Sequence, residues 1–109
     1  GKYIGNGSSD GPFIYTGFKT AFVMIKNTSA IGGWLFVDNK RDTSNVVDKK
    51  IFANLSNAES TADVCDFVSN GFKIRTTDSS QNGSGNTEFY MAFAESPFVN
   101  SKGVPNNAR

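Results

Sequence analysis

Carboxyl groups are the side chains of this sequence that come closest to a catalytic set. The 109-residue chain contains no His, so neither a Ser-His-Asp nor a Cys-His arrangement can be built from it. Its one Cys, Cys65, lies in a strand-like run with Val64, Phe67 and Val68, where we expect a buried and inert thiol. A glycosidase needs only two carboxyl groups, and the acidic residues available for such a pair are Asp38, Asp42, Asp48, Glu59, Asp63, Asp66 and Glu88. Scattered acidic residues are usually solvated surface, so the sequence predicts that the protein is not an enzyme.

Oxygen ligands for a metal ion are concentrated near the N-terminus. Asn6 and Asp10 could contribute to a calcium loop, but the segment lacks the spacing and the terminal Glu of an EF-hand. Gly5 and Gly7 do not indicate a phosphate-binding loop, because no helix is expected after them. With no His and one Cys, the sequence also lacks the ligand clusters of zinc sites. We therefore expect turns here, with no metal site and no cofactor.

Aromatic and polar residues make a better case for non-covalent recognition. Aromatic rings can stack on sugars, and amide or charged groups in neighbouring loops can hydrogen-bond to hydroxyl groups. Trp34 begins a run that is apolar on both faces, which favours core or a subunit interface over a ligand platform. The polar cluster at 39–42 is a better contact surface, although a solvated hairpin end explains it equally well. The candidate binding residues are Trp34, Asn39, Lys40, Arg41, Asp42, Asn82 and Tyr90.

The balance of charge excludes several kinds of partner. Lys and Arg number 11 against 10 Asp and Glu, so the chain lacks the basic field of a nucleic-acid-binding protein. No apolar run approaches the roughly 20 residues that span a bilayer, so we expect no membrane insertion. The length fits a single domain over residues 1–109.

Short apolar runs separated by turn residues predict the elements that must position these groups. Such runs favour an all-β domain, a small antiparallel β-sandwich or jelly roll. Two of them, 21–26 and 34–38, are apolar on both faces and are expected to be buried twice or to meet a neighbouring subunit. The strands are expected at 2–4, 13–15, 21–26, 34–38, 64–68, 72–76 and 89–94.

Four further expectations concern the connections and the last strand. Residues 39–61 are interpreted as a long, partly pinned loop, with a helix over 47–55 as the alternative, and 78–86 as a flexible exposed loop. Asn70-Gly71 predicts a tight hairpin turn with positive φ. In the last strand, Phe89, Met91 and Phe93 are expected to carry the core while the Ala92 and Ala94 face accepts close packing. The tail, 97–109, is expected to lie over the domain as a strap or to reach a neighbouring subunit.

An ordered series of motifs spans nearly the whole chain: 5–18, 21–26, Trp34 with 38–41, 66–76, 90–95 and 97–100. Together these motifs resemble a domain that recurs near the C-termini of tailed-bacteriophage virion proteins, common among viruses of aquatic bacteria. The resemblance implies the C-terminal module of a longer tail fibre or related structural protein on the virion surface. It also implies other virion subunits as partners, and it provides no catalytic motif.

Three hypotheses for function follow. The leading one is a trimeric fibre-tip or fibre-associated domain whose polar loops bind a host-surface glycan or protein, with multivalency strengthening weak contacts. The second is a purely structural capsid-decoration or fibre-assembly domain, which would expose an apolar patch when isolated. The third is a monomeric carbohydrate-binding module.

Overall fold

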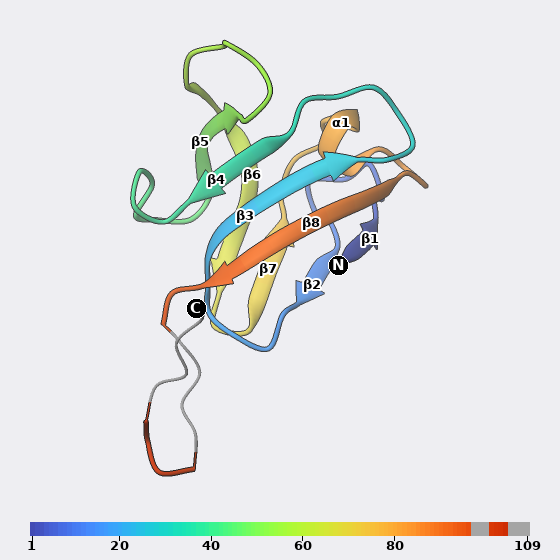
Figure 1. Ribbon diagram of the computed structural model, residues 1–109. Helices are drawn as coiled ribbons and strands as arrows, with labels where there is room; N and C mark the ends of the chain where they lie inside the picture. Colours follow the sequence, from blue (N-terminus) through green and yellow to red (C-terminus); the bar gives the residue numbers. More distant parts are fainter. Residues whose placement is uncertain (97–100, 105–109) are drawn as a thin grey trace.

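The structure, a computed structural model, describes residues 1–96 and 101–104 and is almost entirely β (Figure 1). The prediction of a small antiparallel all-β domain is confirmed. The elements are β1 (Lys2–Ile4), β2 (Phe13–Tyr15), β3 (Thr20–Asn27), β4 (Leu35–Asp38), β5 (Val47–Phe52), β6 (Ser60–Val68), β7 (Gly71–Ile74), α1 (Ser79–Asn82) and β8 (Thr87–Ala94).

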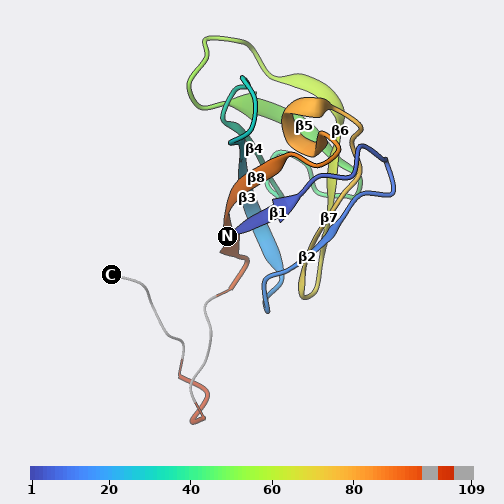
Figure 2. The same ribbon diagram turned by 90° about the vertical axis from the view of Figure 1, so that its right-hand side faces the viewer.

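All the strands belong to one curled sheet. Their order is β1-β8-β3-β4-β5-β6-β7-β2, and every neighbouring pair is antiparallel. The two edge strands, β1 and β2, are joined by the loop 5–12, and the sheet curls until it nearly closes into a barrel (Figure 2). Its two halves face each other across one core, as the two layers of a sandwich would.

The core fills the inside of the barrel. Alternation along β3 turns Val23 and Ile25 inward, where both are completely buried. Phe72 of β7 meets them from the other half of the sheet and makes edge contacts with the rings of Tyr3 and Tyr90. The inner face of β3 is therefore buried as expected, whereas its outward residues are only partly covered. Contact of this outer face with a neighbouring subunit, the other expectation, stays a prediction.

The last strand has the opposite orientation to the one expected. Phe89, Met91 and Phe93 point outward and are exposed, whereas Tyr90 and Ala92 pack against the core. Ala92 lies opposite Val23, and the Tyr90 ring already occupies the space beside Tyr3 and Phe72. The interior accepts a small residue at position 92 because the rings of Tyr3, Phe72 and Tyr90 already fill it.

The interpretation of 39–61 as one long loop is wrong over 47–52 and 60–61, which are strand, and holds for 39–46 and 53–59. The helical alternative over 47–55 is wrong. β5 pairs with β4 on one side and β6 on the other, with Leu35 opposite Phe52. Val47 is buried and Phe52 packs against the core. The charged residues of β5 are accommodated by side-chain partners: Lys49 pairs with Asp48 and Thr61, and Lys50 approaches Asp78.

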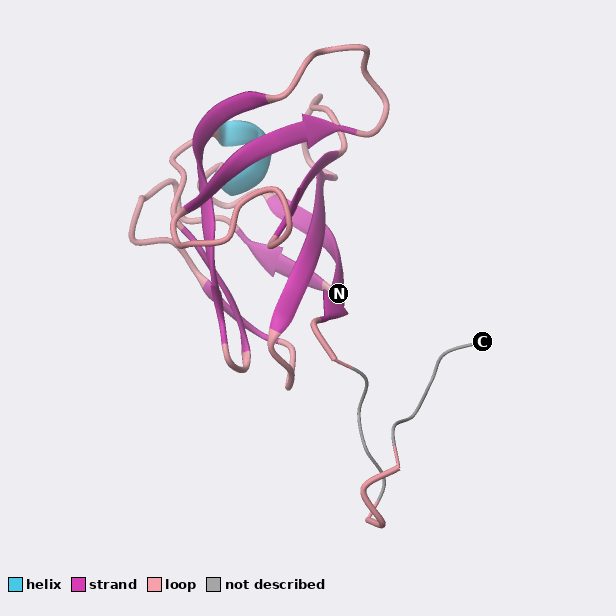
Figure 3. Cartoon of the chain, turned by 90° about the vertical axis from the view of Figure 1, so that its left-hand side faces the viewer, coloured by secondary structure: helices cyan, strands magenta, loops and turns pink. Residues whose placement is uncertain are grey.

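The interpretation of 78–86 as an exposed loop is also wrong. Asp78 caps α1 by accepting a hydrogen bond from the Ser80 N–H, and Gln81 and Asn82 are buried. Asn27 at the end of β3 donates to the Ser79 carbonyl, which fixes the helix against one end of the barrel (Figure 3). The polar composition of the segment reflects capping and buried hydrogen bonds.

Gly71 has a different role from the one expected. Neither Asn70 nor Gly71 has a positive φ. Gly71 is the first residue of β7, and a Cβ at this position would collide with the carbonyl oxygen of Ile14 on β2. Glycine is therefore needed for the close approach of β2 and β7. The expected strap over 97–109 lies largely outside the described residues.

Candidate ligand-binding site

A polar pocket lies at the end of the barrel opposite α1. Its volume is about 310 Å³, near the lower limit for small-molecule sites. β3 begins at this end, β4 and β8 finish at it, and β5 begins at it. The lining residues are Lys19, Thr20, Asn39, Lys40, Asp42, Thr43, Ser44, Asn45, Val47, Phe67 and Glu95.

One wall of the pocket is formed by Lys19 and Glu95. The register of β3 with β8 places Thr20 opposite Ala94, so the residues just outside these strands lie side by side. The Glu95 N–H donates to the Lys19 carbonyl at 2.9 Å, and the Lys19 Nζ lies 2.6 Å from the Glu95 Oε2. The hydrogen bond from Lys19 lowers the pKa of Glu95, so this carboxyl group is charged at neutral pH.

The opposite wall is the connection between β4 and β5, and two side chains hold it in place. The Asn45 amide donates to the Phe67 carbonyl at 2.8 Å, and its oxygen accepts from the Phe67 N–H at 2.9 Å. Asp42 Oδ2 accepts a 2.7 Å hydrogen bond from the Asp48 N–H, and this bond lowers the pKa of Asp42. The wall is therefore fixed to both β5 and β6.

Two buried oxygen atoms in the pocket lack partners. Within the described residues, Thr20 Oγ1 and Asn39 Oδ1 make no hydrogen bond. The Asn39 amide nitrogen is used only weakly, at 3.4 Å from Glu95 Oε1. Leaving buried polar groups unpaired is costly. Both oxygens are closed to solvent as they stand, so a rotation of each side chain is needed to present them to a hydroxyl group or water in the pocket.

The charges around the pocket balance. Lys19 and Lys40 contribute two positive charges, and Asp42 and Glu95 contribute two negative ones. A strongly anionic or cationic ligand would gain little from this arrangement, whereas an uncharged molecule with several hydroxyl groups would find donors and acceptors of both kinds. The site is chemically suited to one neutral, polyhydroxylated ring.

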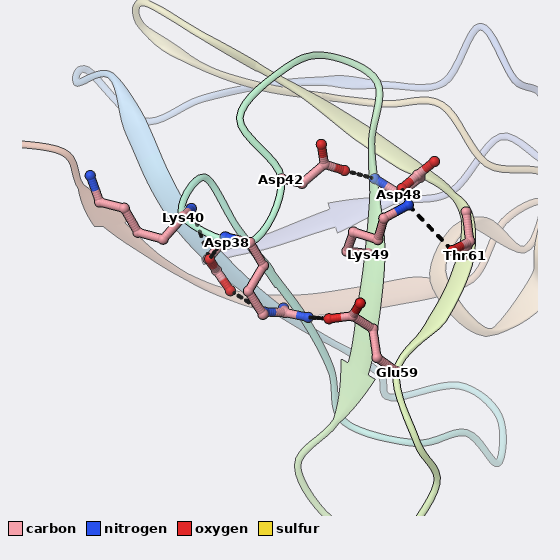
Figure 4. Close-up of polar contacts among 8 residues, drawn as sticks. Asp38, Lys40, Asp42, Asp48, Lys49, Glu59 and Thr61 are labelled. Atoms are coloured by element: carbon pink, nitrogen blue, oxygen red, sulfur yellow. Dashed lines mark hydrogen bonds and ion pairs between the residues drawn. The ribbon is translucent and has the colours of Figure 1, made fainter.

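The structure brings together three of the predicted binding residues. Asn39, Lys40 and Asp42 line the pocket, but Arg41 does not. Its guanidinium bridges Asp38 and Glu59, with distances of 2.7 and 2.8 Å (Figure 4). Partial burial works to raise the pKa of Asp38, but hydrogen bonds from Arg41 and Lys40 outweigh it and lower that pKa. Lys40 joins this network through its backbone N–H alone, and its side chain points away from it.

The other three predicted residues lie elsewhere. Trp34 is 39% exposed and precedes β4. Tyr90 contributes to the core and to the wall of a second pocket beside Gly1 and Tyr15. The placement of Asn82 in an exposed loop is wrong, because its side chain is completely buried and donates to the carbonyls of Ser8 and Thr76.

Several pocket residues were not predicted as a binding set, chiefly Lys19, Thr20 and Glu95. Lys19 and Glu95 are 76 positions apart in the chain, and only the pairing of β3 with β8 brings them together. Thr20 did carry a local signal, since it is a polar residue at the start of an apolar strand.

The chemistry of the described residues is limited. Residues 1–96 and 101–104 hold no group of three or more His, Cys, Asp or Glu side chains positioned for a metal ion. Burial raises the pKa of the Cys65 thiol. No helix in this part of the chain is both long and apolar enough to cross a membrane.

The fold and the pocket define a small all-β domain, a nearly closed antiparallel barrel with a charge-balanced polar site at one end. The sequence matches the model of the family described as "Domain of unknown function (DUF7483)" over residues 1–97, and the chain belongs to this family. No curated protein and no solved structure matches the chain.

Proposed function

We propose that the domain is a non-catalytic attachment module on the surface of a tailed-bacteriophage virion, and that its end pocket binds a neutral sugar unit of a host-surface glycan. The observation that carries the ligand class is the pair of unpartnered buried oxygens, Thr20 Oγ1 and Asn39 Oδ1, in a pocket whose charges balance. The virion context is supported by the resemblance of the ordered sequence motifs.

A hydrolytic role is disfavoured by the state of the pocket carboxyl groups. A glycosidase needs one carboxyl group with a raised pKa to protonate the leaving group. Asp42 and Glu95 instead have lowered pKa values, owing to hydrogen bonds from the Asp48 N–H and the Lys19 amine respectively. Both are therefore acceptors for ligand hydroxyl groups and neither can act as a general acid at neutral pH.

Several copies of the domain would bind more tightly than one. A single small, polar pocket supports only weak binding, and attachment to a repeated surface glycan would depend on multivalency. The proposed partners are therefore other virion subunits, further copies of the same domain and the glycan.

A purely structural role in capsid decoration or fibre assembly is the second candidate. It is favoured by one observation, the exposed row of Phe89, Met91 and Phe93 on the outside of β8. The two roles are compatible in one module, because these three residues do not line the end pocket.

The experiment is a screen of the purified domain, immobilised on beads at high density, against an array of bacterial surface glycans. Binding to uncharged hexose units, reproduced by NMR titration of the soluble domain, is expected. Asn39→Ala and Thr20→Val should both abolish it, whereas Asn57→Ala, an exposed amide outside the pocket, should not. An array with no bound glycan, or binding that survives both pocket substitutions, would reject the proposed ligand site.

A further inference from the structure

The outside of the sheet carries a continuous apolar surface over β8, β3, β4 and β5, which lie side by side in Figure 1. Cross-strand pairing sets its rows: Phe93 lies beside Phe22, and Met91 beside Met24. Met24 is followed by Phe36 and then by Ile51. We call this surface the outer apolar face, and it consists of Phe22, Met24, Phe36, Ile51, Phe89, Met91 and Phe93.

The composition of the outer apolar face is that of the centre of an interface. Phe93 is 54% exposed, Met91 40% and Phe89 38%. At a strand spacing of ~4.8 Å and a rise of ~3.3 Å per residue, each outward residue occupies about 32 Å², so the seven residues cover roughly 200 Å² in projection. Aromatic residues and Met are enriched in the centres of interfaces, and here they are gathered in one patch.

The rings on this face are already arranged as a rigid platform. Phe22 stacks on Phe36 with centroids 5.6 Å apart, and it meets Phe93 edge to face at the same distance. The Arg41 guanidinium lies 5.4 Å from the Phe36 ring centroid. Because these side chains hold one another in place, a partner would bind them with little additional loss of side-chain entropy.

Opposite charges stand at two diagonal corners of the face. Phe89 is flanked in register by Lys2 on β1 and Lys26 on β3, which makes that corner basic. At the other corner Asp38 lies beside Phe22, and Arg41 joins Asp38 to Glu59. Lys49, in the next outward position of β5, is paired with Asp48 at 2.7 Å. With this pair included, three carboxylates and two cations leave the second corner with a net negative charge.

We propose that the outer apolar face binds the same face of a second copy of this chain, across a two-fold axis that lies in the interface. An axis perpendicular to the diagonal between the corners places the basic corner of each copy on the acidic corner of the other, as an isologous interface requires. An anionic membrane surface would be repelled by the Asp38 and Glu59 corner. The pairing rests on the homo-oligomeric part of the proposed function and deepens it. It gives a dimer in place of the trimer of the leading hypothesis from the sequence.

The end pocket stays open in this arrangement. None of the seven residues of the outer apolar face lines it, so a pair presents two pockets. Association and glycan binding are thus separate properties, and a failure of one can be distinguished from a failure of the other.

The first test measures the absolute mass of the purified domain by light scattering after size-exclusion chromatography, over a range of concentrations. A dimer is expected. Met91→Lys should give a folded monomer, whereas Ile31→Lys, at a fully exposed loop position outside the face, should leave the dimer intact. Circular dichroism checks the fold of each variant. A monomeric or trimeric wild type, or a dimer that persists in folded Met91→Lys, overturns the proposal.

A charge exchange tests the orientation of the two copies. Lys2→Glu alone and Glu59→Lys alone should each weaken the dimer severalfold, because each places like charges at the paired corners. The double variant restores opposite charges and should recover much of the affinity. Losses that simply add in the double variant would overturn the two-fold pairing.

Discussion

Tyr3 on β1 and Glu88 on β8 lie opposite each other in the sheet register, and both side chains point into the barrel. The Tyr3 hydroxyl donates to the Gln81 carbonyl at 2.6 Å. Both carboxyl oxygens of Glu88 are buried and have no hydrogen-bond partner within the described residues. Burial raises the pKa of Glu88 to about 7, with Lys26 opposing this shift and Asp78 adding to it.

Replacing Glu88 should therefore change how stability depends on pH. The folded-state pKa is above that of the unfolded chain, so the stabilising contribution is complete below about pH 4.5 and is lost as the pH rises through about 7. The wild type should be less stable at pH 8 than at pH 5, by up to about 2.5 kcal/mol. Glu88→Gln should remove most of this difference and be more stable than wild type at pH 8.

Urea unfolding at pH 5 and pH 8 measures both effects. Asp10, Asp38, Asp42, Asp78 and Glu95 all have lowered pKa values, so their stabilising contributions are lost only in more acidic solution. The chosen window thus isolates Glu88. An unchanged difference in Glu88→Gln would show that this carboxyl group is already ionised in the folded protein at pH 5.

Gly71→Ala tests the close approach of β2 and β7. The added methyl group would collide with the Ile14 carbonyl oxygen, so one strand must move and weaken the hydrogen bonds between them. We expect a loss of about 1–3 kcal/mol in the free energy of unfolding, the usual range for overpacking. Ser69→Ala, two positions earlier in the exposed turn, is the control and should change stability by less than about 0.5 kcal/mol. Equal unfolding midpoints for the two variants would contradict this role for Gly71.

Asn82→Ala separates a structural role from a binding role. The Asn82 side chain accepts from the Asn6 N–H at 2.9 Å and donates to the Ser8 and Thr76 carbonyls, so it ties the loop after β1 to α1. Its loss leaves buried groups unpaired and should lower the free energy of unfolding by about 1–3 kcal/mol. Asn57→Ala, in an exposed loop, should have almost no effect. If Asn82→Ala unfolds like wild type but no longer binds glycan, Asn82 is a binding residue, as the sequence predicted.

The strands that the sequence predicted best are those in which apolar residues alternate with polar or exposed ones and turn residues stand at both ends. β2 and β7 are examples, since Ile14, Phe72 and Ile74 all face inward as alternation requires. β5 was missed because its charged residues find partners such as Asp78 and Thr61, which are distant in the chain. Local composition carries no information about such partners.

The orientation of β8 was missed for a related reason. Alternation shows that two faces differ, but it does not show which face is inside. Here Glu88 and Ala92 face inward while Phe93 faces outward, an arrangement that only the packing of Tyr3, Phe72 and Tyr90 explains. The candidate site was predicted in part, because Asn39, Lys40 and Asp42 are adjacent in sequence. Lys19 and Glu95 join them only through the β3–β8 register.

Asn45→Ala tests whether the pocket wall is held from behind. The Asn45 side chain makes both hydrogen bonds to the Phe67 backbone, and it thereby fixes the connection between β4 and β5 to the end of β6. Without these bonds the Phe67 amide should exchange with deuterium severalfold faster, because local opening no longer has to break the contact with Asn45. Glycan binding should weaken in parallel, since the wall that carries Asp42 becomes less well positioned. Asn39→Ala is the matched control: it should abolish binding and leave Phe67 exchange unchanged. Wild-type exchange at Phe67 in Asn45→Ala would mean that the wall is held by other contacts, such as the bond from the Asp48 N–H to Asp42.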